Sequence, residues 1–365
     1  MKVALVNSKD SPRGRYLLEC MEAGCRAHGD VCEWIQQEAF DDAPKTLAWC
    51  DVAMQICYAN KKFELSTSPG KRRQGDFRRM IDDEMKRLRK RLVTIDTGFV
   101  RNQTEFELEV AFKEGRHILD FTKPETFKEV KSFNLSDPAT YDAVQAKIYY
   151  EVGFDGLKRE ADYCNYTAPG DRWEKLQTPL KPWNSKPGGY LLFLCQTFHG
   201  QSSQAIDIYE HYRRCATELR KFSRLPFLVR HHPRNSKIRG RGTRLDKDRR
   251  AIEQQSLGGF KNWSYSNAVF LADDLAGAAG AVCYSSNAGV MAIIHGVPLY
   301  GTAPIAMAHD CATLHWDTLH PSMPERRPWA YRLAYAQWNC AEMKSGECWW
   351  HLRPHAILHK PGKVT

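Results

Sequence analysis

Several motifs of common enzyme classes are missing from this sequence of 365 residues. There is no GxxxxGK followed by Ser or Thr, which excludes a P-loop nucleotide hydrolase. No GxGxxG follows the first apolar segment, KVALVN at 2–7, which argues against a dinucleotide-dependent dehydrogenase. No apolar run approaches the roughly 20 residues of a membrane-spanning helix, and the N-terminal run is too short for a secretory signal peptide. We therefore expect a soluble, cytoplasmic protein.

The twelve cysteines lack any pairing pattern. No CxxC occurs, and a cytosolic chain keeps scattered thiols reduced, so we expect the cysteines to act as small buried hydrophobic residues. No pair of cysteines or histidines near the C-terminus has the spacing of zinc-finger ligands, so we predict neither a metal ion nor a resident cofactor. The alternative is a metal site built from Cys311, His315, Cys340, Cys348 and His351.

Short apolar segments alternate with helical patterns in both halves of the chain. This alternation predicts an α/β fold with parallel sheets covered by helices. One of the helical patterns, at 202–222, predicts a helix with Ser202 or Ser203 as its N-cap. The apolar segments are 2–7, 51–57, 91–99, 190–196, 226–233, 280–287 and 297–301.

A proline- and glycine-rich segment, TPLKPWNSKPGG at 178–189, separates the two halves and predicts a linker. We expect a Rossmann-like acceptor domain at 1–183, a Rossmann-like nucleotide-sugar domain at 184–327, and a tryptophan-rich helical tail at 328–365 that packs on the body. Ligands of such sheets bind at the carboxyl ends of the strands, and two such domains facing a cleft form the usual place for a substrate.

The positive charge is concentrated in two stretches. Residues 71–91 contain ten Lys and Arg against four Asp and Glu, and residues 234–250 contain eight against two. The rest of the chain is therefore close to neutral, although the net charge is +10. Concentrated positive charge favours a polyanion or a phosphorylated ligand. In the first stretch the alternative is a solvated helix held down by Phe77, Ile81 and Leu88.

Three polar segments of the second half follow predicted strands. YSSNAGV places hydroxyl and amide groups before a helix N-terminus, which is a favourable place for an anion, although Ser286 could simply cap that helix. In VRHHPRN, adjacent histidines on a strand point to opposite faces, which disfavours a shared metal ion and favours contact with a phosphate or nucleotide. With CQTFHGQSS, these segments predict the donor-binding residues Gln196, Thr197, Gln201, Ser202, Arg230, His231, His232, Ser285, Ser286, Asn287 and Gly289.

In the first half, TIDTGFVRNQ places Asp96 at a predicted strand end. A carboxylate there can accept a proton from an acceptor hydroxyl, and Arg101 can hold an anionic group; the alternative is a turn or cap aspartate. A second acidic candidate is Asp155, with Arg159 and Asp162 close behind it; the alternative for Asp162 is a cap or a pair with a lysine. The DKD triplet at 246–248 lies in the basic tract rather than after an apolar strand, so we do not expect it to bind a metal–diphosphate group.

The order of four segments, IDTGFVRN, LLFLCQTFHGQSS, VRHHPRN and YSSNAGVMAIIHGVPLYG, resembles the capsule-polysaccharide Kdo transferases and related sialyltransferase-like enzymes with two Rossmann-like domains. The resemblance spans about 92–301. It implies a catalytic carboxylate at Asp96, and nucleotide binding by residues matching Arg230, His232, Pro233, Ser285, Ser286 and Gly289. This chain departs from the family where Thr97 is inserted and where Met291 replaces an acidic residue, so either a UDP- or a CMP-linked sugar remains open.

Together these observations predict a metal-independent glycosyltransferase that uses a nucleotide sugar. The basic stretches favour a hydroxymethyl-pyrimidine in DNA as the acceptor, as for a viral enzyme in the host cytoplasm. The resemblance favours a bacterial capsule or surface glycan instead. Other classes are a non-catalytic nucleic-acid-binding protein on the same scaffold and a nucleotide-sugar epimerase. The predicted acceptor-binding residues are Arg72, Arg73, Arg78, Arg79 and Arg101.

Overall fold

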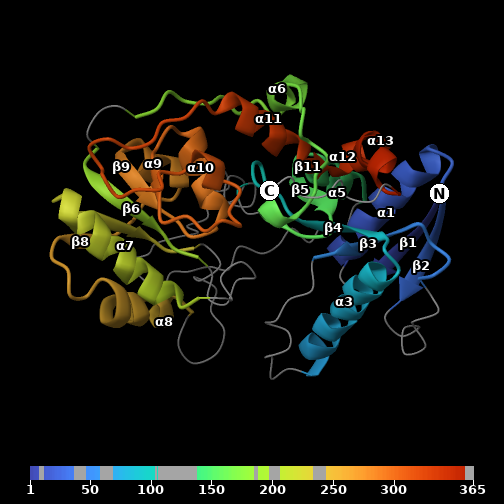
Figure 1. Cartoon of the computed structure of the whole chain (residues 1–365), viewed down its shortest axis with the longest axis horizontal. Helices are drawn as coiled ribbons and strands as arrows, with labels where there is room; N and C mark the ends of the chain where they lie inside the picture. Colours follow the sequence, from blue (N-terminus) through green and yellow to red (C-terminus); the bar gives the residue numbers. More distant parts are fainter. Residues whose placement is uncertain are drawn as a thin grey trace. The chain divides into compact units, whose positions relative to one another are not determined.

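The computed structural model describes residues 1–7, 12–36, 47–57, 69–102, 105, 138–184, 188–196, 206–232 and 244–357 (Figure 1). The described residues group into two compact units. The first unit contains those of Met1–Gln103, Leu135–Arg172 and Tyr331–Thr365, and the second is built on Trp173–Ala330. Each unit is described by itself below.

The second unit begins ahead of the proline-rich linker. Its main segment runs from Trp173 to Ala330, and the domain bounds of 184–327 expected from the sequence stay a prediction. The backbone N–H of Lys181 donates a hydrogen bond of 2.9 Å to the carbonyl of Ile294, which lies in the second unit. The predicted linker is therefore itself joined to the backbone of this unit.

The first unit contains a six-stranded sheet in the order β11-β5-β4-β3-β1-β2. Strands β1 to β4 run parallel, but β5 is antiparallel to both of its neighbours, β4 and β11. The predicted α/β fold is thus confirmed for this unit, while the expectation of a purely parallel sheet is wrong at β5. The strands are β1 (Lys2–Asn7), β2 (Val31–Gln36), β3 (Val52–Ile56), β4 (Arg91–Thr97), β5 (Tyr149–Phe154) and β11 (Gln337–Asn339).

Helix α3 (Pro69–Arg87) packs on the first sheet through an apolar stripe. Phe77, Ile81 and Met85 of this helix are buried in one cluster with Val6 and Leu92 of the strands. The predicted packing of the basic stretch through Phe77 and Ile81 is therefore confirmed. The other helices in the described part of this unit are α1 (Pro12–Ala27), α5 (Pro138–Gln145), α12 (Cys340–Lys344), α13 (Glu347–Leu352) and the 3₁₀ helices η3 (Lys158–Glu160) and η8 (Arg353–His355).

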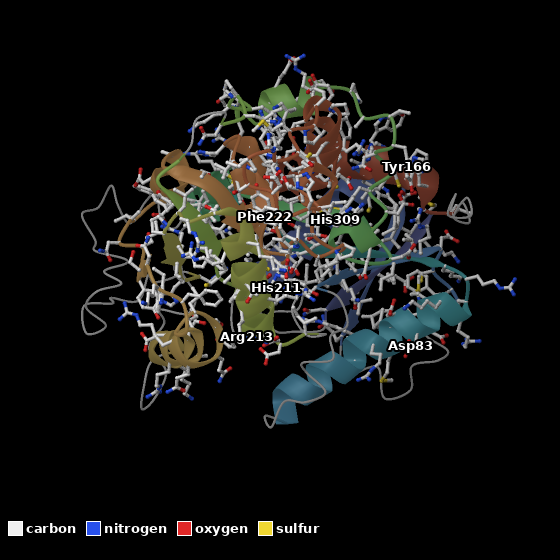
Figure 2. All side chains as sticks on the ribbon, turned by 60° about the vertical axis from the view of Figure 1, so that its left-hand side comes forward. Asp83, Tyr166, His211, Arg213, Phe222 and His309 are labelled. Atoms are coloured by element: carbon white, nitrogen blue, oxygen red, sulfur yellow. The ribbon has the colours of Figure 1, made fainter. Side chains whose placement is uncertain are left out.

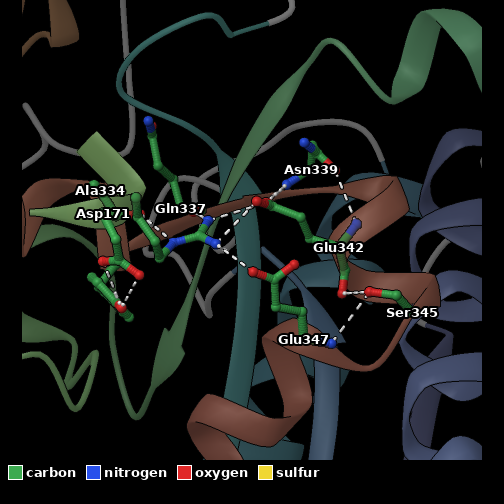
Figure 3. A network of polar contacts seen from close by, with 9 residues as sticks. Asp171, Ala334, Gln337, Asn339, Glu342, Ser345 and Glu347 are labelled. Carbon is green, nitrogen blue, oxygen red and sulfur yellow. Dashed lines mark hydrogen bonds and ion pairs between the residues drawn. The ribbon is translucent and has the colours of Figure 1, made fainter. Parts of the chain in front are cut away.

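The C-terminal segment contributes to the first unit both helices and a strand. Its anchor is the buried guanidinium of Arg172, which pairs with both carboxylate oxygens of Glu342 at 3.0 Å (Figure 3). The same guanidinium donates to the carbonyls of Ala334 and Gln337 and lies 3.5 Å from the ring centroid of Trp338. These contacts hold β11 against the edge of the sheet.

The second unit contains a five-stranded parallel sheet in the order β10-β9-β6-β7-β8. The chain enters at the central strand β6, proceeds through β7 and β8 to one edge, and then returns to β9 and β10 on the other side. The direction of the strand order therefore reverses between β6 and β9. The strands are β6 (Tyr190–Leu194), β7 (Phe227–Arg230), β8 (Trp263–Tyr265), β9 (Ala278–Val282) and β10 (Leu299–Tyr300).

Helices lie on both sides of the second sheet, with α7 and α8 on one side and α9 and α10 on the other (Figure 1). This doubly wound arrangement confirms the predicted Rossmann-like fold of the second half. No helix in the described part of the chain is long and apolar enough to cross a membrane. The remaining helices are α6 (Asp171–Lys175), α7 (Ile208–Phe222), α8 (Arg244–Ala251), the π-helix η6 (Ile252–Ser256), α9 (Leu271–Ala276), α10 (Asn287–Ile294), η7 (His309–Cys311) and α11 (Arg327–Tyr335).

The N-cap predicted for the helix of 202–222 is wrong. Helix α7 begins at Ile208, and Asp207 caps it by accepting hydrogen bonds from the backbone N–H groups of Tyr209 and Glu210. A carboxylate also interacts favourably with the positive end of the helix dipole, which gives aspartate an advantage over serine at this place.

Candidate functional site

The carboxyl ends of β6 and β9 are joined by side chains that the sequence singled out. The Oε1 atom of Gln196, just after β6, accepts hydrogen bonds from the backbone N–H of Ser285 at 2.6 Å and from its hydroxyl at 3.2 Å. The backbone N–H of Gln196 in turn donates to the hydroxyl of Tyr212 on α7. Two predicted donor-binding segments are therefore locked together at the point where the strand order reverses, which is where doubly wound sheets bind ligands.

Ser286 and Gly289 have structural tasks at the start of α10. The hydroxyl of Ser286 accepts a hydrogen bond from the backbone N–H of Ala288, so the capping alternative is present in the structure. A Cβ atom on Gly289 would lie 3.1 Å from Leu299 and 3.2 Å from the thiol of Cys283. The glycine thus permits close packing of α10 on its own sheet. Binding of a donor by this helix N-terminus stays a prediction.

Arg230 forms a buried cross-link at the end of β7. Its guanidinium pairs with the carboxylate of Asp274 at 2.6 Å and donates to the carbonyls of Ala268 and Val269. Both members of the ion pair are only 5% exposed. The hydroxyl of Ser266 completes the arrangement by donating to the same carboxylate. These contacts assign Arg230 a structural role, and its predicted contact with a donor stays a prediction.

The two adjacent histidines occupy different environments. His231 is buried, its Nδ1 atom lies 2.6 Å from the carboxylate of Asp248, and its ring stacks on Tyr265. Asp248 also accepts a hydrogen bond of 2.8 Å from the hydroxyl of Tyr209. His232 is partly exposed. The second aspartate of the DKD triplet therefore orients a histidine, and the described residues contain no group of three or more side chains arranged to hold a metal ion.

In the first unit, contacts with neighbouring strands explain why the IDTGFVRN segment has a glycine after β4. The backbone N–H of Gly98 donates to the carbonyl of Tyr149, and a Cβ atom at Gly98 would lie 2.4 Å from that oxygen. The next two N–H groups, of Phe99 and Val100, donate to the Oε1 atom of Gln337 at 2.8 and 3.0 Å. The turn after β4 is thus fixed from both sides, by β5 and by β11.

Asp96 lies half-buried at the carboxyl end of β4. Its Oδ1 atom accepts a hydrogen bond of 2.7 Å from the backbone N–H of Thr97, and the thiol of Cys57 lies 3.9 Å from the same oxygen. Asp96 therefore makes the backbone contact expected of a turn aspartate, which was the alternative to a catalytic base. Its carboxylate is also partly exposed, so a substrate hydroxyl could reach it. Its role as a base stays a prediction.

A second carboxylate, Glu151, was not singled out from the sequence. It lies directly across from Asp96 on the antiparallel strand β5 and is only 3% exposed. Burial raises the pKa of Glu151 to about 7, and the nearby Asp96 carboxylate contributes to this rise. Hydrogen bonds from the hydroxyl of Tyr163, at 2.6 Å, and from the backbone of Lys158 lower the pKa and only partly offset these effects. In the sequence, the sign that could have pointed to Glu151 is its position as the one acidic residue in the otherwise apolar run YYEVGF.

The other acidic candidates of the first unit are structural. Arg91 is buried and pairs with Asp155 at 3.0 Å and with Asp162 at 2.7 Å, while its guanidinium lies over the ring of Phe154. Burial acts to raise the pKa of Asp162, but the backbone N–H of Cys164 and the Arg91 guanidinium together hold it below its usual range. This network fastens β4 to the segment after β5, so Asp162 pairs with an arginine and not with a lysine.

The predicted acceptor-binding arginines differ in exposure. Arg101 is exposed and has a left-handed backbone with a φ of 51°, Arg79 is partly exposed, and Arg78 is buried. The described residues bring none of these arginines into contact with Asp96 through a recorded hydrogen bond or ion pair. Thr197, Gln201, Ser202, Pro233 and the side chains of Arg72 and Arg73 lie outside the described residues.

No family model matches the chain, and no curated protein matches it in sequence. Solved structures with partial similarity include KpsC of Thermosulfurimonas dismutans, a beta Kdo 2,4 transferase, with 12% identity and a TM-score of 0.46 over 92% of this chain and 90% of that chain. Anabaena Alr3699/HepE, in complex with UDP and glucose, has 9% identity and a TM-score of 0.27 over 98% of this chain and 96% of that chain. The D-lactate dehydrogenase of Escherichia coli has 11% identity and a TM-score of 0.21 over 78% and 66%. TM-scores this low assign no function.

Proposed function

We propose that this protein is a glycosyltransferase that moves a sugar from a nucleotide-sugar donor to a hydroxyl group. The observation that carries the proposal is the Gln196–Ser285 hydrogen bond between the ends of β6 and β9. It joins two of the motif segments at the place where a doubly wound sheet takes a phosphorylated ligand. The order of the four motifs, which resembles the Kdo transferases, gives the proposal its reaction class.

The second unit would bind the donor. The phosphate of a UDP- or CMP-linked sugar would lie at the N-terminus of α10, where the helix dipole favours an anion, and near the partly exposed His232. A helix N-terminus and an imidazole N–H at this place would stabilise the negative charge that develops on the leaving phosphate as its bond to the anomeric carbon breaks. This arrangement needs no divalent metal ion, so we propose a metal-independent transfer.

The first unit would supply the base. Asp96 would remove the proton of the acceptor hydroxyl as its oxygen bonds to the anomeric carbon, and the nucleotide would leave with the bonding electrons. The half-buried position of Asp96, held by Thr97, gives the carboxylate a defined orientation while leaving it accessible.

For the acceptor, we propose a hydroxymethyl-pyrimidine in DNA. The support is the concentration of positive charge at 71–91 and 234–250. Part of that charge is already balanced, because Lys86 pairs with Asp82 and Arg87 pairs with Glu84 on α3. A saccharide acceptor of a surface glycan is the alternative, and transfer to a saccharide in the absence of DNA would replace the DNA proposal.

The donor is tested by a thermal-shift panel of UDP- and CMP-sugars and their free nucleotides, with and without EDTA. We expect one nucleotide to raise the Tm irrespective of EDTA, because a ligand at a hundred times its Kd adds about 2.7 kcal/mol of stability. Absence of a shift with every nucleotide would contradict the proposal, and a shift abolished by EDTA would contradict metal independence.

The base is tested with Asp96→Asn, and Asp83→Asn serves as the matched control. Asp83 is an exposed aspartate on α3 in the same unit (Figure 2). We expect Asp96→Asn to lose transfer by at least 100-fold while donor affinity is unchanged, and Asp83→Asn to retain both. Equal transfer by the two variants would favour a different base, and a wild-type protein that binds a nucleotide without any transfer would favour the non-catalytic class.

A further inference from the structure

Two carboxylates lie opposite each other on neighbouring strands of the first sheet. Asp96 on β4 and Glu151 on β5 are directly opposite in the antiparallel register, so their side chains lie on the same face of the sheet. Cβ atoms of such pairs are about 5 Å apart, and like charges at that position destabilise the sheet. A fold that retains this pair at a strand end needs a means to accommodate the repulsion.

The surroundings of Glu151 supply hydrogen bonds and the positive charge of Lys158. Tyr163 donates its hydroxyl to Glu151 from the segment after η3, and Lys158 donates its backbone N–H. Gln337 is the residue opposite Glu151 on β11, and it is neutral. Among the described groups, Asp96 raises the pKa of Glu151, and Tyr163 and the positively charged Lys158 lower it.

Two neighbouring carboxyl groups in such a place share a proton, because both cannot ionise without strong repulsion. Glu151 is the buried member of the pair, whereas Asp96 is partly exposed. Burial therefore favours the proton on Glu151 rather than on its more exposed neighbour.

We infer that Glu151 is a positioning residue that holds a proton beside Asp96 and thereby controls the charge and basicity of that carboxylate. The inference rests on the proposed role of Asp96 as the base. When Asp96 removes the proton of the acceptor hydroxyl, the carboxyl pair gains one proton, and this proton is lost to solvent after the product leaves. Ionisation of Glu151 raises the basicity of Asp96, since a neighbouring negative charge favours the protonated form.

The carboxyl pair is tested without any substrate by carbon-13 NMR of protein labelled at the glutamate side-chain carboxyl carbons. We expect one resonance, absent from Glu151→Gln, that titrates near neutral pH instead of near pH 4.3. In Asp96→Asn its midpoint should fall by about one pH unit, because the neighbouring charge is gone. A midpoint that is unchanged in Asp96→Asn, or a Glu151 resonance that titrates like an ordinary glutamate, would overturn the inference.

The effect on catalysis is tested by the pH dependence of kcat for wild type and Glu151→Gln. The glutamine keeps the shape of the side chain and an oxygen for the Tyr163 hydroxyl. Glutamine is neutral, like protonated Glu151, so kcat at acidic pH should be unchanged. In the wild type, kcat should rise by up to about tenfold as Glu151 ionises and Asp96 becomes a stronger base, and Glu151→Gln should lack this rise. A kcat that is lower at every pH in Glu151→Gln, with the rise near neutral pH retained, would mean that Glu151 is only structural.

The two experiments separate this inference from the proposed function. If the wild-type protein transfers no sugar from any donor of the panel, the proposed function fails, and the NMR titration still decides whether the carboxyl pair exists. If transfer occurs and depends on Asp96 but Glu151→Gln leaves the pH profile unchanged, the inference fails and the proposed function stands. Glu151→Gln should also keep the wild-type circular dichroism spectrum, and the Asp96→Asn titration provides the test if it does not fold.

Discussion

At the scale of single residues, Gly98 connects the sequence motif to the sheet. Its position after β4 brings the backbone so close to Tyr149 that a Cβ atom would lie 2.4 Å from the carbonyl oxygen. We expect Gly98→Ala to lower the free energy of unfolding by about 1–3 kcal/mol, because the turn must shift away from β5. Chemical denaturation of the purified protein measures this loss.

Gly259 is the matched control for Gly98. A Cβ atom at Gly259 meets no heavy atom within 4 Å. Gly259→Ala should therefore leave the unfolding free energy within about 0.5 kcal/mol of the wild type. Equal stability of the two variants would mean that the turn after β4 yields without cost, and that packing on Tyr149 does not explain the glycine of the motif.

At the scale of secondary-structure elements, the N-cap of α7 contributes to the stability of the second unit. Asp207 satisfies two N–H groups at the start of this helix. We expect Asp207→Ala to destabilise the second unit by about 1 kcal/mol, since it removes both the cap and a favourable charge at the helix N-terminus. Ser202→Ala should have no such effect, and a larger loss for the serine variant in urea denaturation would contradict the assignment.

The sequence predicts well those strands and helices whose apolar pattern is contained in a short stretch of residues. β1, β4, β6, β7 and β9 were all predicted from short apolar runs, and the apolar stripe of α3 from Phe77 and Ile81. The direction of β5 was not predictable, because nothing in YYEVGF distinguishes a parallel from an antiparallel neighbour. Pairing of β11 with β5 joins residues nearly two hundred positions apart, and a local pattern carries no information on such a contact.

In the candidate site too, residues that belong to local motifs were predicted, and residues whose role depends on distant parts of the chain were not. Asp96 was predicted because it directly follows an apolar run, and Ser286 because small polar residues precede a helix. Glu151 was missed because its significance depends on the antiparallel register that places it opposite Asp96. Arg230 was predicted as a ligand contact, yet its partner Asp274 follows it by 44 positions and could not be anticipated from the motif.

At the scale of the whole molecule, the C-terminal segment is an integral part of the first unit. Arg172 and Glu342 form a buried ion pair, with side chains only 4% and 10% exposed. We expect Arg172→Met to destabilise the first unit by about 3–5 kcal/mol, because Glu342 keeps its charge without a partner. The measurement is urea denaturation at neutral pH followed by tryptophan fluorescence.

Glu347 provides the control for this ion pair. It lies 3.7 Å from Arg172, but its side chain is 43% exposed (Figure 3). Because exposed pairs contribute between about 0 and 1 kcal/mol, Glu347→Gln should have little effect. If Arg172→Met were as stable as Glu347→Gln, the C-terminal segment would not depend on the buried pair for its attachment.

The charge distribution of the whole chain leads to a final prediction, which concerns the acceptor. If the acceptor is DNA, the binding constant for duplex DNA should fall linearly with salt on logarithmic axes, with a slope of about −0.9 for each phosphate contacted. Arg101 is exposed, so Arg101→Gln should reduce the magnitude of the slope by about one. Arg213 on α7 is exposed, pairs with Glu210 and is not among the predicted acceptor-binding arginines, so Arg213→Gln should leave the slope unchanged (Figure 2). Fluorescence anisotropy of a labelled duplex at several salt concentrations measures all three proteins, and binding that is undetectable or independent of salt would exclude DNA and favour a saccharide acceptor.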